Sequence, residues 1–219
     1  MDHSAALSAP ILSEPAPRRT QAERRAESED RLLEAAAAII AEEGYMAATL
    51  ERVGERAGFS RGLASRKYGS KDGLIEAVIW RVSAQVHSAV NTATEGLDSP
   101  LEQLLTLFDR FVELVMSDSA VRAYFVLFSA MIANRLETRS VFEQVQERFG
   151  ERIEELVIAA QRRGEISATL PPAHLAFLIG CLLAGISVEA TMDYQAKSTA
   201  DPATLRADLR RMLGAALRG

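Results

Sequence analysis

The sequence of 219 residues contains a single cysteine, Cys181, so no disulfide can form within the chain. This cysteine count is typical of proteins from a reducing compartment, and we expect a cytoplasmic protein. The first residues lack the charged and then apolar pattern of a secretory signal, which predicts that the chain is not exported. Because Cys181 lies in the apolar stretch GCLLAG, we expect it to be a small buried side chain.

Residues typical of catalytic sites are scarce as well. Only three histidines are present, and zinc-ligand spacing, a nucleophile elbow and a phosphate-binding loop are all missing from the sequence. We therefore expect neither enzymatic activity nor a cofactor or metal. Aromatic residues make up only 6% of the chain, whereas Ala, Leu, Glu and Arg are abundant, and no alternating strand pattern occurs. These features predict an all-α fold.

One apolar segment raises the question of a membrane. Residues 175–188, LAFLIGCLLAGISV, carry no charge, but 14 residues are fewer than the ~20 that span a bilayer. We interpret this segment as a buried bundle helix or an interface helix and expect no membrane contact. A membrane-anchored helical protein remains the alternative, which simple fractionation tests.

Capping signals and apolar spacing predict the helices. Residues 1–18 are rich in Ala, Ser and Pro and are expected to be a disordered tail. Thr20 and Glu23 fit a capping box, and Thr49, Ser60 and Ser70 are candidate caps of later helices. The expected helices cover about 21–43, 50–57, 61–68, 71–93, 101–115, 119–134, 138–163, 172–194 and 202–217.

A basic window stands out in an acidic chain, which has 25 Lys and Arg against 30 Asp and Glu. Residues 56–71 contain no acid, and their five cations are Arg56, Arg61, Arg66, Lys67 and Lys71. Two short helices joined by a turn at Gly58 form a helix-turn-helix, whose second helix can lie in the DNA major groove. The outer face of such a motif meets phosphates, where acids would repel. The inner face needs small or apolar residues, and the candidates are Val53, Gly54, Ala57, Ala64 and Tyr68.

Three segments around this window resemble the tetracycline-repressor (TetR) family: RRTQAERR (18–25), RLLEAAAAIIAEEGYMAATLERVGERAGFSRG (31–62) and YGSKDGLIEAV (68–78). The resemblance is specific over about residues 18–80. It implies a homodimeric regulator with a disordered tail (1–18), a helix-turn-helix DNA-binding domain (19–70) and a helical domain for ligand binding and dimerisation (71–219). We expect a repressor that binds a near-palindromic double-stranded DNA operator and is released by a small-molecule effector.

Positions within the helix-turn-helix predict the roles of individual residues. Thr49 is expected to bond a phosphate, Arg61 and Arg66 to contact base edges, and Leu63 to touch a thymine methyl group. Lys71 matches the phosphate-binding lysine of the family. Ser65 and Lys67 depart from the tyrosine and histidine usual there, so the operator cannot be transferred from relatives. The expected DNA-binding residues are Thr49, Ser60, Arg61, Gly62, Leu63, Ser65, Arg66, Lys67 and Lys71.

The C-terminal residues are expected to hold an effector and a second subunit. The candidate pocket residues are Phe108, Phe111, Phe125, Phe128 and Met131, although any one of them can simply belong to the core. The expected dimer contacts are Leu182, Ile186, Leu205, Leu209, Met212 and Leu213. The rival interpretation is a helical ligand-binding or enzymatic protein whose helix-turn-helix no longer binds DNA, which Ser65 in place of tyrosine would favour.

Overall fold

The computed structural model describes residues 20–134, 136–192 and 201–219, apart from the side chain of Arg61. Every regular element within these ranges is a helix, as the composition predicts. The expected tail at 1–18 lies outside the described residues. The end of the helix expected to reach residue 194 also lies outside them.

The N-terminal elements are α1 (Gln21–Glu43), the short 3-10 helix η1 (Tyr45–Ala47), α2 (Leu50–Arg56), α3 (Arg61–Tyr68) and α4 (Lys71–Thr94). The capping box is present, because the Thr20 hydroxyl accepts from the Glu23 N–H and the Glu23 carboxylate accepts from the Thr20 N–H. Thr49 and Ser70 cap α2 and α4 through their side chains. Ser60 occupies the cap position of α3 without a side-chain cap bond.

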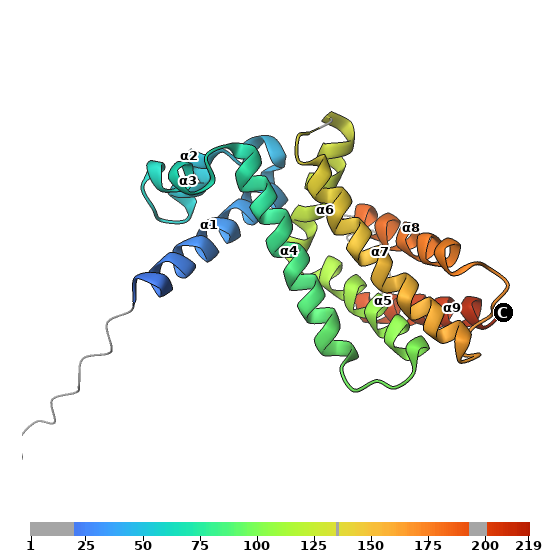
Figure 1. Cartoon of the computed structure of the whole chain (residues 1–219). Helices are drawn as coiled ribbons and strands as arrows, with labels where there is room; N and C mark the ends of the chain where they lie inside the picture. Colours follow the sequence, from blue (N-terminus) through green and yellow to red (C-terminus); the bar gives the residue numbers. More distant parts are fainter. Residues whose placement is uncertain (1–19, 135, 193–200) are drawn as a thin grey trace, which may run out of the picture.

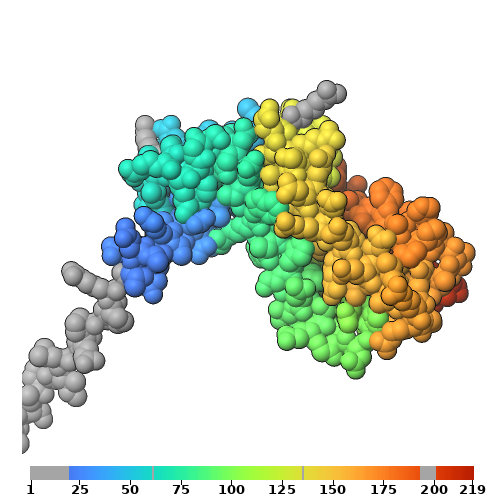
Figure 2. Space-filling view, viewed as in Figure 1, coloured from blue at the N-terminus to red at the C-terminus, as the bar shows by residue number. Residues whose placement is uncertain are grey.

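The remaining helices are α5 (Pro100–Ser117), α6 (Ser119–Asn134), α7 (Arg139–Arg162), α8 (Pro172–Ala190) and α9 (Pro202–Arg218). Figure 1 shows α1 to α3 grouped at one end and α5 to α9 gathered in a larger helical body. Helix α4 runs from the first group along the second. Figure 2 shows the N-terminal helices projecting to one side of this body.

Helices α6 and α4 connect the C-terminal body to the N-terminal group. Helix α6 packs along α1, and α4 contacts α1, α3, α5, α6 and α7. The side-chain amide of Gln85 on α4 donates to the Asp118 carboxylate at 2.6 Å, and Asp118 also accepts from the first N–H groups of α6. Arg81 on α4 is paired with Asp30 and Glu34 on α1. Helices α1, α4 and α6 therefore meet at one polar joint.

Helix α8 leaves an apolar face uncovered. It has 19 residues, a mean hydropathy of 1.8, and only 22% of its most apolar window is buried. By length and composition alone, α8 could cross a membrane, and α5 with α6 passes the same test but is bent by 90°. The helix is therefore longer than the uncharged segment 175–188 within it, and its length does not exclude a membrane span. The exposed apolar face of α8 requires a partner or an apolar medium to cover it.

Candidate DNA-binding face and internal cavity

Helices α2 and α3 cross closely because small residues lie between them. Val53 and Ala64 are fully buried and Ala57 nearly so, and Gly54 is also buried. Gly58 has φ = +76°, a backbone conformation that favours glycine, and it makes the turn between the two helices. The predicted inner face is thus found in the structure.

Arg31 of α1 fastens this turn. Its guanidinium donates to the Ala57 carbonyl oxygen at 2.6 Å and lies 4.8 Å from the centre of the Phe59 ring. A Cβ atom at Gly58 would approach the Arg31 nitrogen to 2.8 Å. The backbone angle therefore favours glycine at position 58, and a larger residue would also have to displace the Arg31 guanidinium. Sequence reasoning missed Arg31, whose only signal is its place in the segment that resembles the family.

The outward face of α3 is polar. Ser60, Gly62, Ser65 and Arg66 are exposed, whereas Leu63 is half-buried against the core and keeps only part of its surface for a base. Arg61 begins α3, but its side chain lies outside the described part of the structure. This arrangement puts a serine hydroxyl at the start of the recognition helix and a guanidinium in its last turn.

Two hydroxyl groups at the helix starts can donate to an anion. Thr49 accepts from the Arg52 N–H at 3.2 Å, and its own N–H donates to the Ala47 carbonyl at 2.9 Å. Only the hydroxyl proton of Thr49 is then left for a phosphate, rather than its backbone N–H. Ser60 has no side-chain cap bond, so its hydroxyl is available in the same way.

Part of the basic window is neutralised by α1. Arg56 forms a two-fold hydrogen bond with Glu42 at 2.6 and 2.7 Å, and Lys67 is 2.7 Å from Glu29. The Arg56 guanidinium lowers the pKa of the Glu42 carboxyl. The window is therefore free of acid along the chain but not in space, because α1 lies beside it. Arg66 is exposed and makes no ion pair with the described residues.

Lys71 lies at the start of α4 beside η1. Its ammonium donates to the Met46 carbonyl oxygen at 3.3 Å and lies 3.9 Å from the centre of the Tyr45 ring. Burial lowers the pKa of Lys71. The aromatic ring and the carbonyl hold the ammonium in place next to the exposed Met46. The sequence did not predict η1, so the contribution of Tyr45 to this corner was missed.

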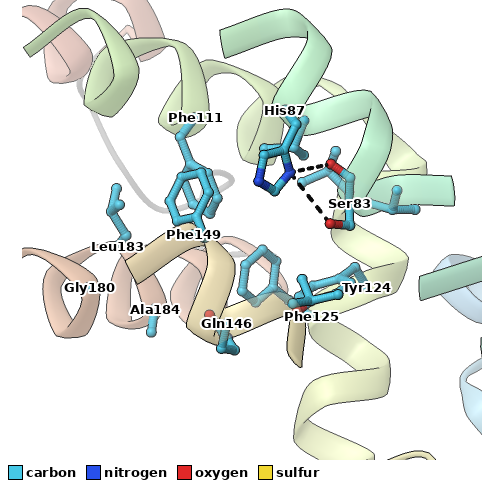
Figure 3. Close-up of a pocket in the computed structure, with 14 residues that line it drawn as sticks. Ser83, His87, Phe111, Tyr124, Phe125, Gln146, Phe149, Gly180, Leu183 and Ala184 are labelled. Atoms are coloured by element: carbon cyan, nitrogen blue, oxygen red, sulfur yellow. Dashed lines mark hydrogen bonds between the residues drawn. The ribbon is translucent and has the colours of Figure 1, made fainter. Parts of the chain in front are cut away.

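A cavity of about 60 Å³, partly open to solvent, lies among α4, α5, α6, α7 and α8 (Figure 3). Aromatic rings form much of its wall: Phe111 lies 5.3 Å from Phe149 and 6.0 Å from Phe125, measured between ring centres. Its polar side chains are Ser83, His87, Tyr124 and Gln146. Burial raises the pKa of Tyr124 well above the ordinary value.

His87 is oriented by the helix turn that precedes it. Its Nδ1 atom lies 2.8 Å from the Ser83 carbonyl oxygen and 3.5 Å from the Ser83 hydroxyl (Figure 3). A carbonyl oxygen only accepts, so Nδ1 carries the proton and donates it. In the neutral imidazole, Nε2 is then a hydrogen-bond acceptor. Sequence reasoning did not select His87 as a site residue, and its only signal in the sequence is the i, i+4 spacing from Ser83.

The five predicted pocket residues do not gather in one place. Phe111 and Phe125 line the cavity, and Phe108 is buried in the core. Phe128 and Met131 border a separate, more polar hollow that includes Arg139 and Glu143. The residues that sequence reasoning missed come mostly from other helices: Val82, Ser83, Val86, His87, Val121, Tyr124, Val145, Gln146, Phe149, Gly180, Leu183 and Ala184.

The predicted dimer residues are also split. Leu182, Ile186, Leu205 and Leu209 are half-buried and Met212 is exposed, but Leu213 is only 6% exposed and belongs to the core of its own subunit. The largest exposed side chains of α8 are Phe177 and Leu178, which were not predicted. Cys181 is exposed, contrary to expectation, because it lies on the face of α8 that the subunit does not cover. Among the described residues, no cluster of acids, histidines and cysteines could hold a metal.

Residues 32–78 match the family model described as bacterial regulatory proteins, tetR family. One curated relative, HTH-type transcriptional regulator BetI 1 of Chromohalobacter salexigens, is 33% identical over 79 residues, which are 36% of this chain and 39% of the relative. The chain thus matches between about a third and a half of the length of its curated relatives.

Solved structures match over most of the chain. A putative TetR-family transcriptional regulator from Rhodococcus sp. has a TM-score of 0.72 and 22% identity, covering 89% of this chain and all of that one. AibR in complex with isovaleryl coenzyme A and operator DNA has a TM-score of 0.69 and 16% identity, covering 84% of this chain and 97% of that one. At such identities these structures show the shared fold. The family match therefore covers the helix-turn-helix, and the solved structures show that most of the chain shares the fold of tetR-family regulators.

Proposed function

We propose that this protein is a cytoplasmic transcriptional regulator that binds double-stranded DNA with α3 in the major groove. The observation that carries the proposal is the outer face of the helix-turn-helix, where Ser60, Gly62, Ser65 and Arg66 are exposed beside the held ammonium of Lys71. Hydroxyl and ammonium groups position a protein on phosphates, and a guanidinium reads guanine edges. In this proposal Arg61 and Arg66 read bases, and Thr49, Ser60 and Lys71 bind phosphates.

Lys67 and Leu63 have smaller parts in this proposal. The ammonium of Lys67 is already bound to Glu29, so a phosphate must compete with a carboxylate for it. Leu63 is packed against the core and offers a base only a part of its surface. Ser65 remains a candidate for a short phosphate contact.

The active unit is proposed to be a homodimer formed through the exposed apolar face of α8 with α9. Phe177, Leu178 and Cys181 lie on this face, and Met212 is exposed on α9. A symmetric pair of subunits would cover both copies of the face and present two recognition helices to successive major grooves, roughly 34 Å apart. The same contact would bury the apolar face of α8, which a membrane could otherwise cover.

We also propose that the protein is a repressor and that the cavity holds an effector that opposes its binding to DNA. Helix α4 begins with Lys71 and carries Ser83 and His87 of the cavity wall roughly three and four turns later. Helix α6 carries Val121 and Tyr124 and packs along α1. A ligand that reshapes the cavity would thus act on two helices that support the recognition helix. Ligand and DNA affinity would be coupled by one reciprocal free energy.

Selection of bound sites from random DNA tests the proposal. We expect a near-palindromic site with half-site centres about 10 base pairs apart, bound by two chains per duplex. Replacing the exposed Arg66 with alanine is expected to cost about 1–3 kcal/mol of operator binding and to relax base preference at one position in each half-site. Failure to enrich any sequence, with a particle that is monomeric or needs detergent, would instead favour the rival whose helix-turn-helix does not bind DNA.

A further inference from the structure

The chemistry of the cavity wall restricts what the effector can be. We propose that the effector is a compact, uncharged and mostly apolar molecule that donates one hydrogen bond to Nε2 of His87. This inference rests on the proposed function, in which the cavity is the effector site. It adds the charge, size and polarity of the ligand.

The first restriction is charge. Among the described residues that line the cavity there is no Asp, Glu, Lys or Arg. The wall is largely apolar, with Phe111 and Phe125 buried at 8% and 4% exposure. An ionised group transferred into such surroundings loses its hydration without gaining an opposite charge, which is strongly unfavourable. A carboxylate or phosphate inside this cavity would therefore have no permanently charged partner, and it could gain one only if His87 took a second proton on Nε2.

The second restriction is polarity. Nδ1 of His87 is occupied by the Ser83 carbonyl oxygen, and this bond fixes the proton on Nδ1. The opposite edge of the imidazole, with the acceptor Nε2, faces the aromatic side chains in Figure 3. His87 lies edge to face with Phe149, with 5.9 Å between the ring centres. A hydroxyl or N–H group on the ligand can pair with Nε2, whereas a ligand with acceptors alone cannot.

The third restriction is size. The cavity volume of about 60 Å³ is well below the ~150 Å³ of an engineered cavity that binds benzene. A six-membered ring is therefore fully enclosed only if the rim moves. Gln146 is exposed and Phe149 is half-buried, so both can turn outward. These dimensions favour a molecule of one small ring over a long acyl chain.

Gly180 provides a way to fill this space. It lines the cavity, and a Cβ atom built there meets no other heavy atom within 4 Å. A leucine at this position would thus occupy the ligand space without a clash at its first carbon. Gly150 on α7 also has open space around its Cβ position but does not line the cavity, so Gly150→Leu is a matched control.

Calorimetric titration of the full-length protein without DNA tests the proposal with two pairs of probes. Phenol and toluene have equal numbers of heavy atoms but differ in the hydrogen-bond donor. Benzamide and benzoate match in size but differ in charge. We expect phenol to bind roughly threefold to tenfold more tightly than toluene, the gain of one hydrogen bond. Benzamide is expected to bind about tenfold or more tightly than benzoate, because the ion must be desolvated.

Three variants locate the interaction. His87→Phe is expected to keep toluene binding and to bring the phenol-to-toluene ratio to about one. Gly180→Leu is expected to abolish binding of both, and Gly150→Leu to leave both unchanged. Equal affinities of phenol and toluene, tighter binding of benzoate, no binding of any probe, or unchanged binding by Gly180→Leu would each overturn the proposal.

The outcome is separable from that of the proposed function, because these titrations contain no DNA. If phenol binds as expected but leaves operator affinity unchanged, the ligand class stands and the effector role fails. If only anionic compounds release the operator, the regulatory role stands and the ligand class is wrong.

Discussion

The helix-turn-helix and the cavity are built in opposite ways. The candidate DNA contacts lie between Thr49 and Lys71, close together along the chain, and local caps and turns place them. The cavity takes its wall from five helices, between Val82 and Ala184. A function carried by one short segment is visible in the sequence, whereas a cavity exists only after distant helices have packed. The two regions also differ in how much space surrounds the glycines within each of them.

Glycines make this difference measurable. In the N-terminal region, Cβ atoms at Gly58 and Gly73 would come within 2.8 and 2.4 Å of other atoms. In the C-terminal helices, Cβ atoms at Gly150, Gly180 and Gly185 would meet nothing within 4 Å. Gly73 is therefore required by close backbone packing and Gly58 is favoured by its positive φ, whereas Gly150, Gly180 and Gly185 leave open space.

The largest expected effect is the loss of stability in Gly73→Ala. The added Cβ would lie 2.4 Å from the Tyr68 carbonyl oxygen, which is backbone and can move only with the joint between α3 and α4. We expect a loss of about 1–3 kcal/mol in the free energy of unfolding, measured by urea denaturation. Gly150→Ala in the middle of α7 should instead gain about 0.5–1 kcal/mol from helix propensity. Equal changes in the two variants would contradict the difference between the regions.

The same difference explains which features the sequence predicts. Thr20, Thr49 and Ser70 were identified as caps because a cap bonds to its own next turn, within three residues. The apolar spacing predicted the long helices for the same reason, because it too is a pattern among residues close together in the chain. The burial of Leu213 and the exposure of Cys181 depend on which face of a helix another helix covers, and helical spacing alone does not fix that choice.

Candidate-site residues divide in the same manner. Phe111 and Phe125 were expected at a pocket and line one, because both are large and lie on inward faces. Phe108 has the same character but points into solid core. The sequence does not predict His87 as a polar residue of the cavity, because its place there depends on the Ser83 carbonyl oxygen and on aromatic rings from other helices.

A second expected effect compares two buried tyrosines. The Tyr68 hydroxyl, in the helix-turn-helix, is buried and has no hydrogen-bond partner among the described residues, whereas Tyr124 lines the cavity. Removing an unpaired buried hydroxyl removes its desolvation penalty, so Tyr68→Phe is expected to stabilise the fold by about 1 kcal/mol. Tyr124→Phe is expected to change stability less. Denaturation of the two variants under one set of conditions checks this, and destabilisation by Tyr68→Phe would show that the hydroxyl has a partner.

Alkaline pH gives an independent measurement of the same group. Burial raises the pKa of Tyr68 to about 12 from an ordinary value of 10. Because the unfolded phenol ionises first, its contribution to stability is complete below pH 10 and is lost as the pH rises towards 12. Tyr68→Phe should therefore lose less stability than the unchanged protein between these two pH values.

The smallest expected effect concerns charge, where the two regions differ most. The cavity wall has no charged side chain among the described residues, whereas the recognition face has cations partly held by α1. Glu29 binds the Lys67 ammonium at 2.7 Å, so Glu29→Gln would free that ammonium for a phosphate. Because an exposed ion pair is worth about 0.2–1 kcal/mol, binding to random DNA should tighten by no more than about fivefold.

The salt dependence shows whether this gain comes from a new phosphate contact. One additional neutralised phosphate steepens the slope of log affinity against log salt by about 0.9. Glu147→Gln, the same change of charge on α7, should leave that slope unchanged while altering the net charge equally. If both variants change affinity alike, the effect is that of total charge. If Glu29→Gln alone steepens the slope, α1 carboxylates limit non-specific binding, and specificity for the operator depends on acids that the basic window itself does not contain.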